Sequence, residues 1–368
     1  MRSHDLVFWQ NNLSLHQAPL MKALTSSFGK RVLVVVPEGL SEARNAMGWS
    51  QPDFGNATIL VAETGESRFL AVNQNRDAEA HYFSGLGAYP SVDFSLRELV
   101  AGPHNHVGII SESWDPRGAK GKLRAIRMTG RVKKQTRAVD SFYVAGDLAQ
   151  RQFRRAGVPT VKLRDFGYSV DIHPTIPLPN AASEFHIVFV GILDERKDPT
   201  TLVQALNRMP DLKWRADFYG DGPLGEKLRS LINVRGLTDR VRFHGNASNA
   251  EVRRVIATSD VLVLPSRYDG WGAVVNEALM NGTPALVSRS CGAAVLIADD
   301  SCGAVFSGGN VSELERQLRS RIASGKQSSA SREKLAEWSQ EAISPRSMAG
   351  YLLEELGNNK LGMAPWKR

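Results

Sequence analysis

Short apolar runs alternate with amphipathic stretches along the first half of the chain. The runs are five or six residues long and predict strands at 5–9, 31–36, 57–62, 106–111, 141–145 and 161–166. The stretches between them have the length and the apolar spacing of helices. Strands that alternate with helices in this way predict a mostly parallel sheet covered by helices.

The second half repeats this alternation with clearer boundaries. Apolar runs predict strands near Phe185, Trp214, Val241, Val261, Ala285 and Ala304. Amphipathic stretches such as 199–208 and 224–235 separate them and predict the helices of a doubly wound sheet. Beyond Val311 the pattern is helical, and Pro345 suits the first turn of a final helix.

A polar segment rich in proline separates the two halves. Residues 169–183 include prolines at 174, 177 and 179 and precede the strand near Phe185. A chain of 368 residues is longer than one core usually supports. We therefore expect two domains joined by a linker at this segment.

Composition places the chain among globular proteins. Hydrophobic residues make up 42% and charged residues 23%. Residues 1–10 lack the pattern of a signal peptide, and no window has the length of a membrane span, so we expect a cytoplasmic protein. Cys291 and Cys302 alone supply neither a disulfide framework nor a cysteine metal site.

The positive charge is unevenly distributed. The chain has a net charge of +8, and residues 1–180 hold 22 Lys and Arg against 16 Asp and Glu. Residues 117–137 contain nine cations and no acid, among them Lys120, Lys122, Arg124, Arg127, Arg131, Lys133 and Lys134. Leu123, Ile126 and Met128 lie between them, so a helix here predicts a basic amphipathic surface for anionic headgroups or the pyrophosphate of a lipid-linked acceptor. Nucleic acid is disfavoured because aromatic residues are absent from the run, and a solvated helix face stays an alternative.

In an open parallel sheet, ligands bind beyond the carboxyl ends of the strands, and two such segments of the second half contain glycines. Gly191 follows one strand, with Arg196 and Lys197 just ahead of a helix, which suits a diphosphate. Gly220 and Gly222 follow the next strand and allow the backbone to approach a neighbour or a ligand. A surface turn with solvated charges is the alternative for the first segment.

The most informative segment is 266–278, directly after the strand near Val261. Asp269 and Glu277 lie eight positions apart, and Gly270 and Gly272 flank Trp271 in the loop between them. Asp269 and the loop amides suit a sugar, and Glu277 suits the vicinal hydroxyls of a ribose. The alternative is a helix-capping Asp269 and a solvated Glu277.

The order of these motifs resembles that of family 4 glycosyltransferases. The resemblance covers the region from Phe185 to Ala304 and includes Gly191 with Lys197, the Asp269–Glu277 pair and the Gly-Thr-Pro-Ala-Leu-Val-Ser run that ends at Ser288. It implies the GT-B fold, an α/β architecture in which two Rossmann-like doubly wound domains face each other across a cleft. Residues 1–172, with a returning C-terminal helix at 345–368, would bind the acceptor, and residues 173–344 would bind the nucleotide sugar.

The same resemblance implies roles for single residues. Lys197 would bind the donor diphosphate, Asp269 and the amides near Gly270 and Gly272 the donor sugar, and Glu277 the ribose. Family members generally retain the anomeric configuration and need no metal, so no cofactor is expected. Two positions depart from the common pattern: Ile192 stands where an arginine often follows the glycine, and Asp269 stands where a glutamate is usual. Arg196 is then a candidate substitute for the missing arginine.

The first half resembles the family less closely. Residues 10–20 follow the first strand, and we expect Asn12, Ser14 and His16 on the acceptor side, although His16 also suits helix capping or packing. Glu112 ends another strand and is a candidate catalytic-region residue. His104 and His106 precede that strand without an acidic or thiol partner, which favours a turn over a metal site.

These patterns favour a transferase that moves a sugar from a UDP- or GDP-sugar to a lipid-linked or saccharide acceptor. Assembly of bacterial surface polysaccharide, at the inner face of the plasma membrane, is the role that the family suggests. A sugar-nucleotide epimerase of similar fold is one alternative. A catalytically silent, membrane-associated binding subunit is the other.

Overall fold

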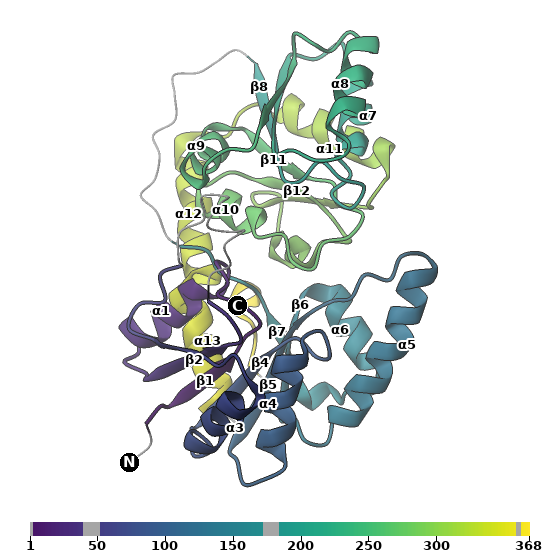
Figure 1. The fold of residues 1–368 in the computed structure, drawn as a ribbon. Coiled ribbons are helices and arrows are strands. Elements are labelled where there is room, and N and C mark those ends of the chain that lie inside the picture. The colour runs from purple at the N-terminus through teal and green to yellow at the C-terminus, as the bar shows by residue number, and fades with distance from the viewer. Residues whose placement is uncertain (1–2, 40–51, 172–183, 358–361) are drawn as a thin grey trace. The chain divides into compact units, whose positions relative to one another are not determined.

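The computed structural model describes residues 3–39, 52–171, 184–357 and 362–368 and contains two compact units. One unit comprises Met1–Asp171 with Ala342–Arg368, and the other comprises Ile172–Glu341. Of the predicted linker, residues 172–183 lie outside the described residues. Each unit is a parallel sheet covered by helices (Figure 1), which confirms the predicted α/β fold with two Rossmann-like domains.

The first unit contains a seven-stranded sheet in the order β3-β2-β1-β4-β5-β6-β7, with all neighbouring strands parallel. Its strands are β1 (Leu6–Trp9), β2 (Val32–Val36), β3 (Thr58–Val61), β4 (Ala80–Ser84), β5 (His106–Glu112), β6 (Ser141–Ala145) and β7 (Leu163–Phe166). Its helices are α1 (Ala18–Ser26), α3 (Gly65–Gln74), α4 (Pro90–Val100), α5 (Gly118–Gln135), α6 (Gly146–Arg155), η1 (Thr160–Lys162), α13 (Pro345–Gly357) and η3 (Pro365–Lys367).

The second unit contains a six-stranded parallel sheet in the order β10-β9-β8-β11-β12-β13. Its strands are β8 (Phe185–Val190), β9 (Trp214–Tyr219), β10 (Val241–Gly245), β11 (Val261–Leu264), β12 (Ala285–Ser288) and β13 (Gly303–Phe306). Its helices are α7 (Pro199–Asn207), α8 (Gly225–Val234), α9 (Asn249–Thr258), α10 (Val274–Met280), η2 (Gly292–Leu296), α11 (Val311–Ser324) and α12 (Ser329–Ile343). The last two residues of α12, Ala342 and Ile343, already belong to the first unit.

Strand alternation divides each sheet into two buried faces. In the second unit, Phe189 and Phe218 pack with Leu206 of α7, Ile232 of α8 and Leu318 of α11. In the first unit, α3, α4, α5 and α6 supply the equivalent core, while α1 and α13 pack against each other. Because both faces of a parallel sheet are covered, its strands are mostly apolar, which made most of them visible in the sequence.

The sequence prediction missed β4, which lies at the centre of the first sheet beside β1. His81 interrupts its apolar pattern and is nevertheless fully buried. The Trp9 indole N–H donates a hydrogen bond to His81 Nδ1 at 3.2 Å. Burial lowers the pKa of His81 to about 4, so the ring is neutral and behaves as a core residue.

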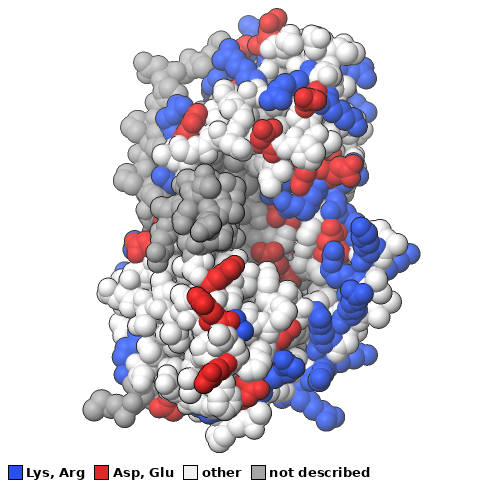
Figure 2. Space-filling model, in the orientation of Figure 1, with Lys and Arg blue, Asp and Glu red and all other residues white. Residues whose placement is uncertain are grey.

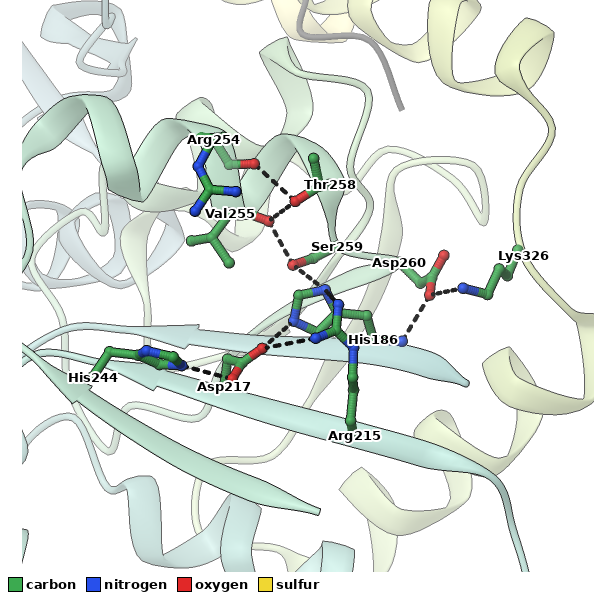
Figure 3. Close-up of polar contacts among 10 residues, drawn as sticks. All are labelled: His186, Arg215, Asp217, His244, Arg254, Val255, Thr258, Ser259, Asp260 and Lys326. Atoms are coloured by element: carbon green, nitrogen blue, oxygen red, sulfur yellow. Dashed lines mark hydrogen bonds and ion pairs between the residues drawn. The ribbon is translucent and has the colours of Figure 1, made fainter. Parts of the chain in front are cut away.

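A buried polar network crosses β8, β9 and β10 on the face opposite the Phe189 core (Figure 3). Asp217 accepts hydrogen bonds from His186 Nε2 at 2.6 Å and His244 Nε2 at 2.7 Å. Arg215 donates to His186 Nδ1, and Tyr219 stacks on His244. Burial alone would raise the pKa of the Asp217 carboxyl, but the two histidine hydrogen bonds outweigh it and lower the pKa to about 2. The network therefore joins three strands through one ionised carboxylate.

Within the described part of the chain, no helix is both long and apolar enough to cross a bilayer.

Candidate active site

The candidate site of the second unit lies where the strand order reverses. β8 and β11 are neighbours, but the chain crosses from β8 to β9 on one side and from β11 to β12 on the other. The loops beyond the carboxyl ends of such a strand pair diverge and leave a crevice, which is where open α/β sheets bind ligands. The predicted residues Lys197 and Asp269 lie on these two loops.

The two loops meet through opposite charges. The Lys197 ammonium contacts Asp269 Oδ2, and Arg196 Nη1 lies 3.6 Å from Asp269 Oδ1. The Lys197 amide donates to Asp194 Oδ1 at 2.7 Å, which fixes the turn that precedes α7. Two cations, 72 and 73 positions away along the chain, are thus concentrated on one carboxylate at the switch point.

Asp198 and Arg267 hold these loops together, and sequence reasoning did not select either residue. Asp198 adopts a left-handed conformation with φ of 50°, the only described non-glycine residue with positive φ. Arg267 Nε binds Asp198 Oδ2 at 2.8 Å, and the Arg267 amide donates to the Arg196 carbonyl at 2.9 Å. These contacts flank Lys197 and Asp269, so they fix the distance between the two loops. The one sequence signal was an aspartate directly before Pro199.

Gly220 and Gly222 pack against protein backbone. A Cβ at Gly220 would lie 2.1 Å from the Gly191 carbonyl oxygen, and one at Gly222 would lie 2.7 Å from that of Leu193. Both glycines also have positive φ. Of the two alternatives open at these positions, close approach to a neighbour accounts for both glycines: they hold the loop after β9 against the Gly191 loop.

Trp271 was predicted among the donor-binding residues of this loop, and its side chain is buried. It is 3% exposed, and its indole N–H donates to Asn276 Oδ1 at 2.8 Å. The Trp271 carbonyl accepts a hydrogen bond from the Cys291 thiol, and a Cβ at Gly272 would lie 2.6 Å from that sulfur. The buried Trp271 side chain therefore anchors the Asp269 loop. Gly272 has a φ of 95° and packs too tightly against Cys291 for any larger residue.

Glu277 lies on α10 and is partly buried. Desolvation raises the pKa of its carboxyl to about 7, and the charge of Arg253 opposes this shift. The alternative of a fully solvated Glu277 is therefore wrong. A desolvated carboxylate gains more from a hydroxyl donor than a solvated one does, because it has less water to lose.

The corresponding edge of the first sheet brings together residues from the loop after β1 and the ends of β4 and β5. Gln17 donates to Ser84 Oγ at 3.3 Å. The Tyr168 hydroxyl is hydrogen-bonded to Gln17 and Glu112, and burial raises the pKa of this tyrosine well above its usual value. The His16 ring lies 6.5 Å from the Tyr168 ring. The predicted residues His16 and Glu112 thus belong to one cluster, whose members Gln17, Ser84 and Tyr168 sequence reasoning missed.

Asn12 and Ser14 precede α1 in the same loop. Ser14 Oγ accepts the His16 amide at 3.2 Å, and the Ser14 carbonyl accepts the amides of Gln17 and Ala18. Ser14 therefore shapes the start of the helix, and Asn12 is partly exposed beside it.

His104 and His106 form no metal cluster. His104 Nδ1 bonds to the Gly102 carbonyl in a turn, while His106 is the first residue of β5. Over residues 3–39, 52–171, 184–357 and 362–368, no group of three or more His, Cys, Asp or Glu could hold a metal ion.

Part of the chain matches known proteins by sequence. Residues 177–342 match the family model of glycosyl transferases group 1. A D-inositol 3-phosphate glycosyltransferase of Arthrobacter sp. (strain FB24) is 32% identical over 133 residues, which cover 34% of this chain and 32% of that protein. The matches span about a third of the length of the first curated relatives.

Solved structures match nearly the whole chain. The lipopolysaccharide outer core galactosyltransferase WaaB gives a TM-score of 0.73 at 15% identity, covering 96% of this chain and 99% of that one. Anabaena HepE, in complex with UDP and glucose, gives 0.72 at 15% identity, with the same coverage. The chain therefore has the GT-B fold, and its residues 177–342 match the family model of glycosyl transferases group 1.

Proposed function

We propose that this protein transfers a sugar from a UDP- or GDP-sugar to a lipid-linked or saccharide acceptor in glycan biosynthesis, with retention and without a metal ion. The observation that carries the proposal is the convergence of Lys197 and Arg196 on Asp269 at the β8–β11 switch point. A sugar diphosphate requires cations for its phosphates and a carboxylate that accepts hydrogen bonds from its sugar hydroxyls, and this cluster contains both.

Donor binding would exchange partners within this cluster. The diphosphate would take the Lys197 ammonium and the Arg196 guanidinium, and Asp269 would accept hydrogen bonds from the donor sugar. When the bond between the sugar and the diphosphate breaks, the departing phosphate gains negative charge, and the two cations stabilise it. They would thereby take the place of a metal ion.

The nucleoside half of the donor would bind Glu277. Its partly buried carboxylate suits the two ribose hydroxyls, and their hydrogen bonds favour the ionised form of the group. Glu277 is thus a binding residue in this proposal, and Lys197 and Arg196 are the groups that act on the reacting diphosphate.

The acceptor would bind the cluster of Gln17, Ser84, Glu112 and Tyr168 in the first unit. These groups are hydrogen-bond donors and acceptors with a single negative charge, which suits neutral sugar hydroxyls. In a retaining transfer the acceptor oxygen forms the new bond on the side from which the phosphate leaves. The acceptor proton then passes to a departing phosphate oxygen, so no protein nucleophile is needed.

Relatives support the choice of substrates to test first. HepE was solved with UDP and glucose, and the curated relative is named a D-inositol 3-phosphate glycosyltransferase. A uridine donor is therefore the first candidate, and hydroxyl-bearing saccharides are the first acceptors.

The test is a transfer assay in EDTA with UDP-glucose, UDP-galactose or GDP-mannose and a panel of saccharide acceptors. We expect release of nucleoside diphosphate that depends on the acceptor, with a product whose anomeric proton coupling matches that of the donor. A change of sugar isomer without an acceptor would show an epimerase instead. Absence of turnover with every donor, despite nucleotide binding, would indicate the silent binding subunit.

A further inference from the structure

The positive charge of the protein is concentrated in one segment. Residues 117–155, which contain α5 and α6, hold 12 Lys and Arg and 2 Asp, a net charge of +10. The whole chain has a net charge of +8, so all other residues together sum to −2. Figure 2 shows this concentration as a band of Lys and Arg over the surface of α5. The proposed donor site does not account for it, because its cations lie in the second unit.

The outer face of α5 combines these cations with exposed aliphatic side chains. Gly121 and Val132 are buried and turn one side of the helix toward the core of the first unit. At 3.6 residues per turn, Leu123 lies nearly opposite both of them, and Ile126 lies one turn further along the same side. Leu123 is 50% exposed and Ile126 is 71% exposed.

The cations surround this aliphatic pair. Lys120, Lys122, Arg124, Arg127, Lys133 and Lys134 are all exposed, and α5 carries no acidic residue. Some basic groups have local partners: Arg117 pairs with Asp115, Arg124 donates to the Asp115 carbonyl, and Arg131 donates to the Gly87 carbonyl. Lys122 and Arg127 lie on either side of the aliphatic pair, which makes them the best positions for a test.

An anionic bilayer matches both features at once. Lipid phosphates attract Lys and Arg near the surface, and aliphatic side chains gain free energy when they leave water at the headgroup boundary. Single-stranded nucleic acid would favour aromatic side chains among the cations, and α5 has none. An acidic protein partner would pair with the cations, but it would use the exposed aliphatic side chains only if it carried a matching apolar patch.

We propose that α5 docks the first unit onto an anionic bilayer surface, with Leu123 and Ile126 inserted at the headgroup boundary and the surrounding cations on lipid phosphates. This inference goes beyond the proposed transfer reaction and does not depend on it, because it concerns where the protein is held. A lipid-linked acceptor would be presented at the same surface.

The test is co-sedimentation of the full-length protein with vesicles of phosphatidylcholine alone, or with 30% phosphatidylglycerol. We expect binding to the anionic vesicles at about 0.1 M salt, and much weaker binding at about 0.5 M salt or with neutral vesicles. Lys122→Gln with Arg127→Gln should weaken binding more than tenfold, since each cation near an anionic surface contributes a factor of about five. Leu123→Ser with Ile126→Ser should weaken it about tenfold.

The matched control is Val234→Ser with Lys227→Gln on α8 of the second unit, where Val234 is 80% exposed. This variant should bind like the wild type, and all variants should keep the wild-type melting temperature. Equal binding to neutral and anionic vesicles, an equal loss in the α8 control, or binding unchanged by both α5 variants would overturn the proposal. Single-stranded DNA that displaces the protein from vesicles at equal phosphate concentration would also overturn it, in favour of nucleic acid.

Discussion

The carboxyl edges of the two sheets share a topology and differ in chemistry. In the second unit, the reversal between β8 and β11 places two cations on the Asp269 carboxylate. In the first unit, the reversal between β1 and β4 places Gln17 beside Ser84, with Tyr168 and Glu112 completing a hydrogen-bonded cluster. One edge thus suits an anionic ligand, and the other suits neutral hydroxyls. Similar folds acquire different ligands through the loops at this edge.

The largest effect is expected from Lys197→Ala. Removing a group that stabilises charge on the departing diphosphate should lower kcat/KM about 10²- to 10³-fold and weaken nucleotide binding. Initial rates of nucleotide release, with Lys227→Ala on α8 as the control of equal charge change, measure this. A Lys197→Ala enzyme as active as the control would show that the anionic ligand does not bind at this edge of the second sheet.

Glu112→Gln should lower sugar transfer without changing nucleotide binding. It keeps the size of the side chain and removes its charge, so transfer should fall about tenfold to hundredfold through the loss of a charged hydrogen bond. The melting shift caused by nucleotide should stay at the wild-type value, since the donor edge is unchanged. If Glu112→Gln instead abolished the nucleotide shift, the assignment of acceptor and donor to separate edges would be wrong.

Glu277 should make nucleotide affinity depend on pH. The pKa of the free group is raised to about 7, and ribose hydroxyls bind the ionised form. Affinity should therefore be highest above pH 7 and fall, by up to about tenfold per pH unit, below it. In Glu277→Gln, affinity at pH 8 should be about tenfold weaker and this dependence should vanish. Calorimetric titration at pH 6, 7 and 8 decides between these outcomes, and a flat wild-type profile would speak against the ribose role.

The smallest effect on transfer is expected from Asp217→Asn, which lies in the second sheet but outside the crevice loops. Because the pKa of Asp217 is lowered to about 2, its charge stabilises the fold above pH 4, and this contribution disappears as the pH falls from about 4 to 2. The variant should lose about 2 kcal/mol of unfolding free energy at pH 7. Its stability should also fall less steeply over that acid range.

Urea unfolding followed by circular dichroism measures both quantities. Transfer activity at a temperature well below the midpoint should change less than twofold. A large loss of activity in this folded variant would mean that the network takes part in the site.

The two halves also differed in how far their sequences predicted them. All six strands of the second sheet were predicted, including β8, β9 and β10, in which polar residues such as His186, Asp217 and His244 alternate with apolar ones. In the first sheet, β4 was missed because its apolar core is only Tyr82 and Phe83, between His81 and Ser84, and only the bond to Trp9 shows why a histidine is buried there. A strand this short gives little periodicity signal once a buried polar side chain takes one of its positions.

In the candidate site, the motifs predicted which loops take part, but they did not predict which residues of the two loops contact each other. Lys197 and Asp269 were each predicted, yet their contact depends on β8 and β11 being neighbours, which is a property of the sheet order. Asp198 and Arg267 were missed for the same reason, since their pairing crosses between loops. The burial of Trp271 could not be predicted, because a tryptophan between two glycines gives no sign of which way its ring points.

The central claim is that the crevice between β8 and β11 binds the diphosphate of a nucleotide sugar through Lys197 without a metal ion. Thermal unfolding with UDP, GDP or ADP at equal millimolar concentration, with and without magnesium, tests it most directly, because a ligand of the native state raises the midpoint. The account predicts a rise with one uridine or guanosine diphosphate that is independent of magnesium and absent in Lys197→Ala. A rise that requires magnesium, that persists in Lys197→Ala, or that occurs with none of the nucleotides would contradict it.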